Sequence, residues 1–206
     1  MIVRIWQRVQ DSLLAVLLGG CIAPAHAEGS ALEDGMYAEF QTSKGTITLR
    51  LEFEKVPLTV MNFVGLAEGT KESNKPEGTR FYDGTKFHRV IEDFMIQGGG
   101  MTADKKPKAS RDPIINEADN GLKNLRGTVA MARTNDVNSA TSQFFINVEV
   151  NGSLDYKNKE NSRSWGYAVF GRVVDGMDVV DNIRLVATDP RDVPIEVVLI
   201  ESVEIH

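Results

Sequence analysis

The chain has 206 residues, of which 42% are hydrophobic and 25% charged, and this is enough for one globular domain with a sizeable core. Its formal net charge of −6, without any run of Lys and Arg, argues against nucleic acid as a partner, because an acidic surface repels phosphates. A single cysteine and three histidines argue against a disulfide framework and against a metal centre.

Residues 1–27 differ from the rest of the chain and have the features of a secretory signal peptide. Arg4 and Arg8 make the start basic, an apolar run follows at 13–18, and Ala25-His26-Ala27 provides the small residues of a cleavage site. The apolar stretch spans roughly a dozen residues, whereas a membrane-spanning helix needs about 20. We therefore expect cleavage after Ala27, a periplasmic location and no stable membrane span.

Residues 28–36 are expected to form a short linker, followed by a single domain over 37–206. A second interpretation of the leader uses Leu18-Gly19-Gly20-Cys21, which resembles a bacterial lipobox whose cysteine is lipidated. Glycine is an uncommon residue two positions before that cysteine, so a lipid anchor through Cys21 is the minor alternative.

The domain is expected to begin with a hairpin followed by a helix. Polar and apolar residues alternate over 37–42 and 46–53, on either side of Ser43-Lys44-Gly45, and this is the period of two strands joined by a turn. From Pro57 the apolar residues recur at helical spacing, and Gly69 follows the last of them. The helix is therefore expected to end just before Gly69.

The stretch 86–100 predicts two short strands around one unusual cation. Apolar side chains recur at alternate positions up to Ile91, and a Glu92-Asp93 turn then leads to Phe94-Met95-Ile96 and a run of glycines. Arg89 lies among these apolar residues, stays charged at any ordinary pH and offers a planar set of donors. Taken alone, it is explained as well by a solvent-facing side chain or by an ion pair with a carboxylate.

A second pair of predicted strands, 127–134 and 143–148, also places a polar side chain among apolar ones. Gln143 directly precedes the aromatic pair Phe144-Phe145. A buried amide needs a hydrogen-bond partner, and exposed Phe side chains need a lid or a ligand. Together with Arg89, these residues suit an apolar pocket with a few placed hydrogen-bond donors.

The remaining elements complete a mainly β chain. Asn151-Gly152 marks a turn, 165–174 and 197–205 have strand patterns, and 177–183 has the spacing of a short second helix. Residues 155–164 are polar and are expected to form a loop. We count about seven or eight strands and two helices, joined by hairpins or loops, which favours an antiparallel closed sheet over alternating β and α units.

The sequence lacks the residues that most kinds of enzyme catalysis require. No G-x-S-x-G motif is present, so a serine hydrolase would have to build its triad on His88, and a core histidine hydrogen-bonded within the sheet is the simpler explanation. The glycines at 98–100 belong to neither of the glycine-rich phosphate motifs. We expect no metal and no cofactor.

Four stretches of the sequence are recognisable as motifs: Phe87-His88-Arg89-Val90, Phe94-Met95-Ile96-Gln97-Gly98-Gly99, Met131-Ala132 and Ser142-Gln143-Phe144-Phe145-Ile146. Together they resemble the signature of the cyclophilin family of peptidyl-prolyl cis/trans isomerases. The similarity extends over 37–206, and residues 116–118 and 165–171 are similar to the bacterial branch. The resemblance implies a mainly β fold, an eight-stranded antiparallel closed β-barrel capped by two α-helices, with a substrate groove on its outside.

The resemblance also implies roles for the matching positions. Arg89 would be the catalytic residue. The proline pocket would consist of Phe94, Met95, Phe145 and Leu154, and the groove that holds the peptide backbone of Gln97, Ala132 and Gln143. Tyr167 would also bind substrate, at a position where many eukaryotic members have a histidine. Ser153 stands where many have a tryptophan, so tight binding of cyclosporin is not implied.

The expected function is therefore acceleration of X-Pro bond rotation in exported proteins during folding. The partners would be proline-containing peptides and unfolded or folding proteins, and the chain would act as a monomer. The alternative is a chaperone-like binding module of the same fold, which recognises proline-containing segments without turnover. The intact Arg89 favours the enzyme, because a pure binder has no need of a cation in its pocket.

Overall fold

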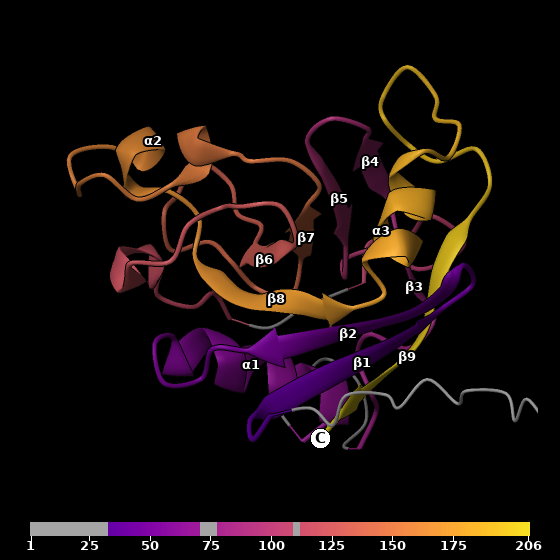
Figure 1. Ribbon diagram of the computed structural model, residues 1–206, viewed down its shortest axis with the longest axis horizontal. Coiled ribbons are helices and arrows are strands. Elements are labelled where there is room, and N and C mark those ends of the chain that lie inside the picture. The colour runs from indigo at the N-terminus through magenta and orange to yellow at the C-terminus, as the bar shows by residue number, and fades with distance from the viewer. Residues whose placement is uncertain (1–32, 71–77, 109–111) are drawn as a thin grey trace, which may run out of the picture. The chain divides into compact units, whose positions relative to one another are not determined.

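The computed structural model describes residues 33–70, 78–108 and 112–206. The expected leader over 1–27 and most of the expected linker lie outside these residues. Within them, the chain forms one antiparallel sheet of nine strands that curls into a nearly closed barrel (Figure 1). The strands are β1 (Met36–Thr42), β2 (Gly45–Leu51), β3 (Thr85–Phe87), β4 (Arg89–Ile91), β5 (Met95–Gly98), β6 (Thr128–Met131), β7 (Phe144–Asn147), β8 (Val169–Asp175) and β9 (Val198–Ile205).

The order of the strands shows how the barrel closes. Neighbours run β3-β9-β1-β2-β8-β6-β7-β5-β4, so β3 and β4 stand at the two ends of the sheet. Only His88 separates these two strands in the chain. Because β3 pairs with β9 and β4 pairs with β5, the segment 85–91 crosses from one end of the sheet to the other. Counted as one bent strand, this segment reduces the nine strands to the eight that were expected.

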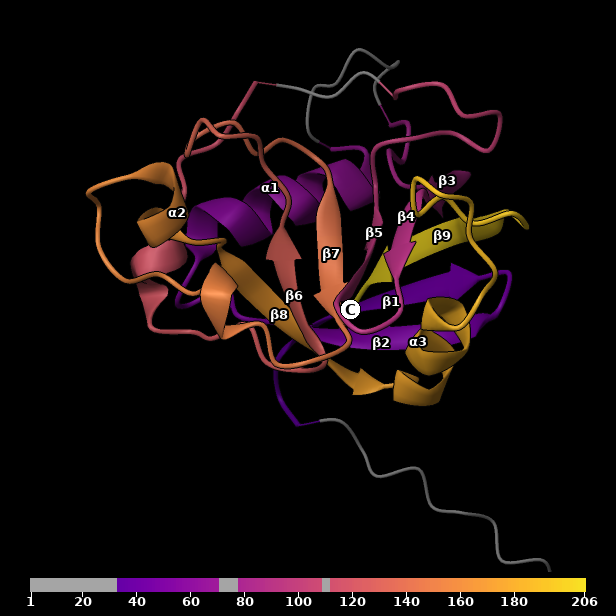
Figure 2. The same cartoon turned by 90° about the horizontal axis from the view of Figure 1, so that it is seen from above.

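Three α-helices lie in the described residues: α1 (Pro57–Glu68), α2 (Ser162–Trp165) and α3 (Met177–Arg184). Two short 3₁₀ segments, η1 (Ala118–Asn120) and η2 (Gly152–Leu154), complete the regular structure of this part of the chain. The helices α1 and α3 were expected, and they lie at different ends of the barrel (Figure 2). In the described part of the chain, no helix has the length and apolar character needed to cross a membrane.

The helix α2 was not expected, since it lies at the end of a polar segment predicted to be a loop. One helical turn is too short to show a helical period in the sequence. A reciprocal cap holds it: the amide of Ser164 donates to Asn161 Oδ1 at 3.0 Å, and the amide of Asn161 donates to Ser164 Oγ at 3.1 Å. The strand expected from residue 165 consequently begins only at Val169.

The core of the barrel is built around Phe63 of α1. Its ring centre lies 5.1 Å from that of Tyr82, 5.3 Å from that of Phe170, 6.0 Å from that of Phe40 and 6.1 Å from that of Phe144. All five side chains are at most 1% exposed. The helix therefore fills one end of the barrel with an aromatic side chain that several strands contact at once.

A second apolar cluster lies on the outer face of the sheet. Successive side chains of a strand point to opposite faces, so Phe144 enters the core while Phe145 faces outward. Phe145 packs there with Met95, Ala130 and Val169, each at most 4% exposed. The partly buried residues packed against this cluster are Ile91, Phe94, Leu122, Ala132, Leu154 and Tyr167. An apolar cluster thus lies on the outside of the barrel, where the resemblance implies a substrate groove.

Candidate active site

Arg89 lies on β4, directly opposite Gln97 on β5. Residues that oppose each other in an antiparallel pair point to the same face of the sheet, so these two side chains share the outer face. Arg89 is exposed, whereas the next residue, Val90, is buried in the barrel core. The alternation along β4 therefore directs the guanidinium outward while the strand itself stays anchored.

A small cavity of about 120 Å³ lies beside this guanidinium, and we call it the Arg89 pocket. It is lined by Arg89, Phe94, Met95, Gln97, Ala132, Arg133, Phe145, Leu154 and Tyr167. Met95 and Phe145 form a buried floor, and the ring of Tyr167 meets that of Phe145 edge-on at 5.7 Å. The structure thus gathers eight of the nine predicted site residues around one cavity.

The remaining predicted residue, Gln143, does not line the pocket but is hydrogen-bonded to two residues that do. Its Oε1 accepts a hydrogen bond from Gln97 Nε2 at 2.9 Å, and its backbone carbonyl accepts one from the amide of Ala132 at 2.8 Å. Gln143 therefore fixes the side chain of one pocket residue and the backbone of another. The roles of all nine residues in binding and catalysis stay predictions.

Asp192 is a neighbour of Arg89 that the sequence analysis missed. Its Oδ2 accepts from Nε of Arg89 at 3.4 Å, and its backbone carbonyl accepts from the amide of Val90 at 2.8 Å. The loop before β9 is therefore attached to β4 at two points. The ion pair does not draw Arg89 out of the pocket, which it still lines. The two residues are 103 positions apart, so no local pattern could have revealed the contact.

Arg133 is the second cation at the pocket, and sequence reasoning missed it as well. Its guanidinium lies 4.4 Å from the ring centre of Tyr167. It donates to the carbonyl of Gly166 at 2.9 Å and to that of Ser162 at 2.6 Å. Its place directly after the Met131-Ala132 motif was the one available signal.

His88 does not take part in the pocket. It is half-buried between β3 and β4 and not part of the core, and its backbone amide donates to the carbonyl of Gln97 at 2.9 Å. Burial is the main cause that lowers the pKa of His88 below its ordinary value. In the described residues no serine hydroxyl bonds to it, so the arrangement gives a hydrolase triad no support. Nor does the described part of the chain contain a group of three or more His, Cys, Asp or Glu residues that could hold a metal ion.

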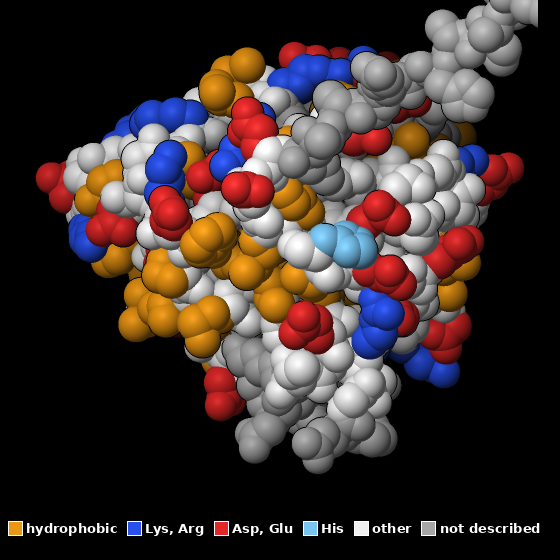
Figure 3. Space-filling view, turned by 60° about the horizontal axis from the view of Figure 1, so that its bottom comes forward, with side chains coloured by type: hydrophobic (Ala, Val, Ile, Leu, Met, Phe, Trp, Pro, Cys, Tyr) orange, Lys and Arg blue, Asp and Glu red, His pale blue; other side chains and the backbone are white. Residues whose placement is uncertain are grey.

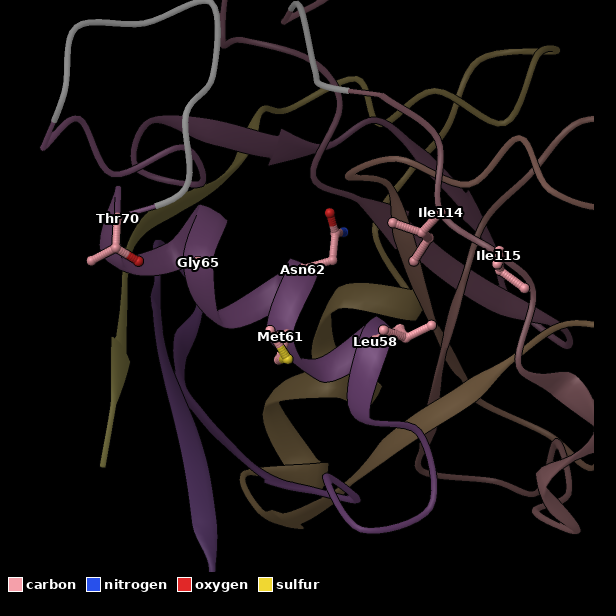
Figure 4. A pocket seen from close by; sticks show the side chains of 7 residues that line it. All are labelled: Leu58, Met61, Asn62, Gly65, Thr70, Ile114 and Ile115. Atoms are coloured by element: carbon pink, nitrogen blue, oxygen red, sulfur yellow. The ribbon is translucent and has the colours of Figure 1, made fainter.

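A larger groove of about 490 Å³ lies on α1 and shares no residue with the Arg89 pocket. Figure 3 shows hydrophobic side chains gathered on the face that carries α1, and Figure 4 shows the groove itself. Leu58, Met61 and Ile115 are its exposed apolar residues, and none of its described lining residues is charged. Among the described residues the groove lacks a cation, and the side-chain amide of Asn62 that lines it donates to the carbonyl of Thr141 at 2.6 Å, so chemistry favours the Arg89 pocket as the site.

The chain matches the family model described as cyclophilin type peptidyl-prolyl cis-trans isomerase/CLD over residues 37–205. It is 52% identical over 171 residues to a peptidyl-prolyl cis-trans isomerase of Streptomyces antibioticus, an alignment that covers 81% of this chain and 96% of that relative. It is also 43% identical over 203 residues to peptidyl-prolyl cis-trans isomerase A of Dickeya dadantii, with 97% of both chains covered.

The fold has a counterpart among solved structures. A cyclophilin type peptidyl-prolyl cis-trans isomerase of Cryptosporidium parvum has the same fold, with a TM-score of 0.66 and 24% sequence identity. The superposition covers 83% of this chain and 97% of that structure. Since the family model spans nearly the whole barrel and bacterial relatives are about half identical to it, the chain belongs to the family of cyclophilin-type peptidyl-prolyl cis-trans isomerases.

Proposed function

We propose that this isomerase turns X-Pro bonds of exported proteins in the Arg89 pocket, with Arg89 as the catalytic residue. The observation that carries the proposal is that one guanidinium and an apolar floor line the same small cavity. At about 120 Å³ this cavity is well below the roughly 300–1,000 Å³ of ordinary ligand sites, so it suits one small ring rather than a whole ligand.

The chemistry requires no nucleophile. Rotation about the X-Pro bond meets a barrier near 20 kcal/mol and takes roughly 10–100 s without catalysis. In the twisted transition state the amide resonance is lost, and the proline nitrogen regains a lone pair. A donor aimed at that nitrogen stabilises the twisted state more than either planar ground state, which is the condition for catalysis.

The pocket residues divide this work between them. Met95 and Phe145 would seat the proline ring and exclude water, which strengthens the interaction with the charge on Arg89. Gln97, held by Gln143, would bind a flanking carbonyl of the peptide and fix the orientation of the X-Pro bond. The terminal nitrogens of Arg89 would then face the imide.

Replacement of Arg89 by alanine tests this proposal. We expect kcat/KM for a proline peptide to fall by two or more orders of magnitude, equivalent to about 3 kcal/mol, as when one transition-state donor is removed. The matched control is Arg172→Ala, an exposed arginine on β8 outside the pocket, which should keep wild-type activity. An Arg89→Ala variant as fast as wild type would defeat the mechanism.

The same variant separates the enzyme from a pure binding module. If Arg89→Ala abolishes turnover but cells carrying it still fold their exported proteins normally, proline-segment binding without turnover is the cellular role. If cellular function is lost together with turnover, isomerisation is the role. Calorimetric titration with a proline peptide shows whether the variant still binds.

Export is the second part of the proposal, and the basic, apolar and small-residue pattern of 1–27 supports it. Cell fractionation of the full chain should recover it from the periplasm, and mass spectrometry should find Glu28 as its first residue. A lipid-modified Cys21 would instead establish the anchored form. A cytoplasmic chain that keeps its first residues would refute export and leave the catalytic proposal untouched.

A further inference from the structure

A second cavity, of about 570 Å³, adjoins the Arg89 pocket, and we call it the Arg163 hollow. We propose that it binds an acidic side chain of the substrate close to the proline, so that the enzyme prefers X-Pro bonds flanked by Asp or Glu. The inference rests on the proposed function, because it assigns a substrate class to the same site.

The two cavities form one continuous surface. Arg133, Leu154 and Tyr167 line both of them. A peptide whose proline ring occupies the Arg89 pocket therefore has the Arg163 hollow beside it, within reach of a neighbouring side chain. The hollow has several times the volume of the pocket, which leaves room for a long side chain.

The charge of the hollow is positive and uncompensated. Arg133 and Arg163 line it, and none of its other described lining residues is charged. In the described part of the chain neither arginine forms an ion pair. The chain as a whole has a formal charge of −6, so this is a local exception in an acidic molecule. A cavity lined by charges of one sign attracts groups of the opposite charge and raises their local concentration.

Arg133 supplies a fixed charge. Its nitrogens donate to backbone carbonyls and to one hydroxyl, and its plane lies over the ring of Tyr167. These partners are neutral, so they immobilise the guanidinium without cancelling its charge. Because its N–H groups are already used, Arg133 acts on a substrate carboxylate through the field and not through a direct hydrogen bond.

Arg163 is then the residue that contacts the carboxylate. It is exposed, and its backbone belongs to the single turn of α2 that Asn161 and Ser164 cap. The carbonyl of Ser164 also accepts from the amide of Lys157 at 2.8 Å, which attaches the turn to the preceding loop. The backbone that carries Arg163 is therefore held, while its side chain is free to meet a ligand.

Paired peptides test the proposal on the full domain. Short capped peptides with one proline would carry either Glu or Gln at each position before and after it, and NMR exchange spectroscopy would measure cis/trans turnover without a helper protease. At one or more positions we expect kcat/KM for the Glu peptide to exceed that for the Gln peptide about two- to fivefold at low salt, the effect of one exposed ion pair. The ratio should fall towards one in high salt, because exposed charges are screened.

Variants assign the effect to Arg163. Arg163→Gln should remove most of the Glu preference and leave only the smaller effect of the field of Arg133, whereas Arg172→Gln, which changes the net charge equally outside the hollow, should keep the Glu/Gln ratio. Equal turnover of Glu and Gln peptides by the wild type at every position, or a ratio that Arg163→Gln leaves undiminished, overturns the subsite. If the wild type isomerises none of the peptides, the proposed function itself fails, so the two failures are distinguishable.

Discussion

Arg89 meets Asp192 at the edge of its pocket, in a contact too weak to matter for stability. The 3.4 Å distance and the exposures of 45% and 43% put this ion pair in the class that contributes about 0–1 kcal/mol. Its effect is on orientation: with Nε directed at Asp192, the terminal nitrogens of the guanidinium remain available to the substrate. Asp192 is therefore expected to act as a positioning residue for Arg89.

We predict that Asp192→Asn lowers kcat/KM for proline peptides about three- to tenfold and leaves the Tm nearly unchanged, since it loosens Arg89 without removing a buried group. Asparagine is the suitable substitute because Asp192 has a φ of 63°, which Asn tolerates better than most residues. Arg191→Gln, in the same loop, is the control and should behave as wild type. Unchanged activity in Asp192→Asn would show that Arg89 needs no such support.

His88 predicts a pH dependence of stability. Burial lowers its pKa in the folded state below the ordinary 6.5, so the folded chain binds this proton more weakly than the unfolded chain. The contribution of neutral His88 to the free energy of unfolding is complete above pH 6.5, and it is lost as the pH falls from 6.5 through the pKa of the folded state. Carboxyl groups with a lowered pKa, such as that of Asp181, contribute stability that is present above the ordinary pKa of 3.8 and is lost mainly as the pH falls below about 4, on the acid side of this window.

Urea unfolding at a series of pH values between about 5 and 8 checks this expectation. The free energy of unfolding of the wild type should decline towards the acid end, and that of His88→Gln should decline less, because the titrating group is gone. Parallel curves for the two proteins would show that protonation of His88 does not affect stability.

At the scale of elements, Phe63 is the largest of the side chains that α1 buries in the core. Phe63 contacts the rings of Phe40, Tyr82, Phe144 and Phe170 inside the barrel. We predict that Phe63→Ala lowers the free energy of unfolding by about 3–5 kcal/mol, the range for a large aromatic removed from a core.

Met61→Ala is the matched control for this variant, because Met61 lies on the same helix and is 68% exposed. It should change the free energy of unfolding by about 0.5 kcal/mol or less. Denaturant titration of both variants gives the comparison. Equal effects of the two substitutions would mean that α1 is not anchored through its buried face.

The long elements and the short strands β5, β6 and β7 could be predicted from the sequence, whereas α2 and the division between β3 and β4 could not. The hairpin of β1 and β2 and the helices α1 and α3 follow from periodicity over seven or more residues. The helix α2 has four residues and is held by its cap, so the sequence shows no helical period there. The division of 85–91 into β3 and β4 likewise depends on which strands lie beside it, which is information that a single sequence does not contain.

The candidate site, too, could be predicted from the sequence only in part. The motifs around Arg89 and Gln143 were recognisable because each is contiguous in the chain. Asp192 and Arg163 were not, since the loop before β9 and the short helix α2 reach the Arg89 pocket and the hollow beside it only after the barrel has formed. The members of the site that come from a motif were thus predictable, and those that depend on long-range folding were not.

For the whole molecule, the position of Arg89 on the seam between the two ends of the sheet has a consequence for refolding. The residue stands on β4, and the pairing of β3 and β4 with their separate neighbours is what joins those ends. While β3 is not yet paired with β9, β4 is already paired with β5, but the loop before β9 that carries Asp192 is not yet held beside Arg89. Recovery of enzymatic turnover after dilution from denaturant would therefore time the last step of assembly, and should lag behind the return of secondary structure seen by circular dichroism.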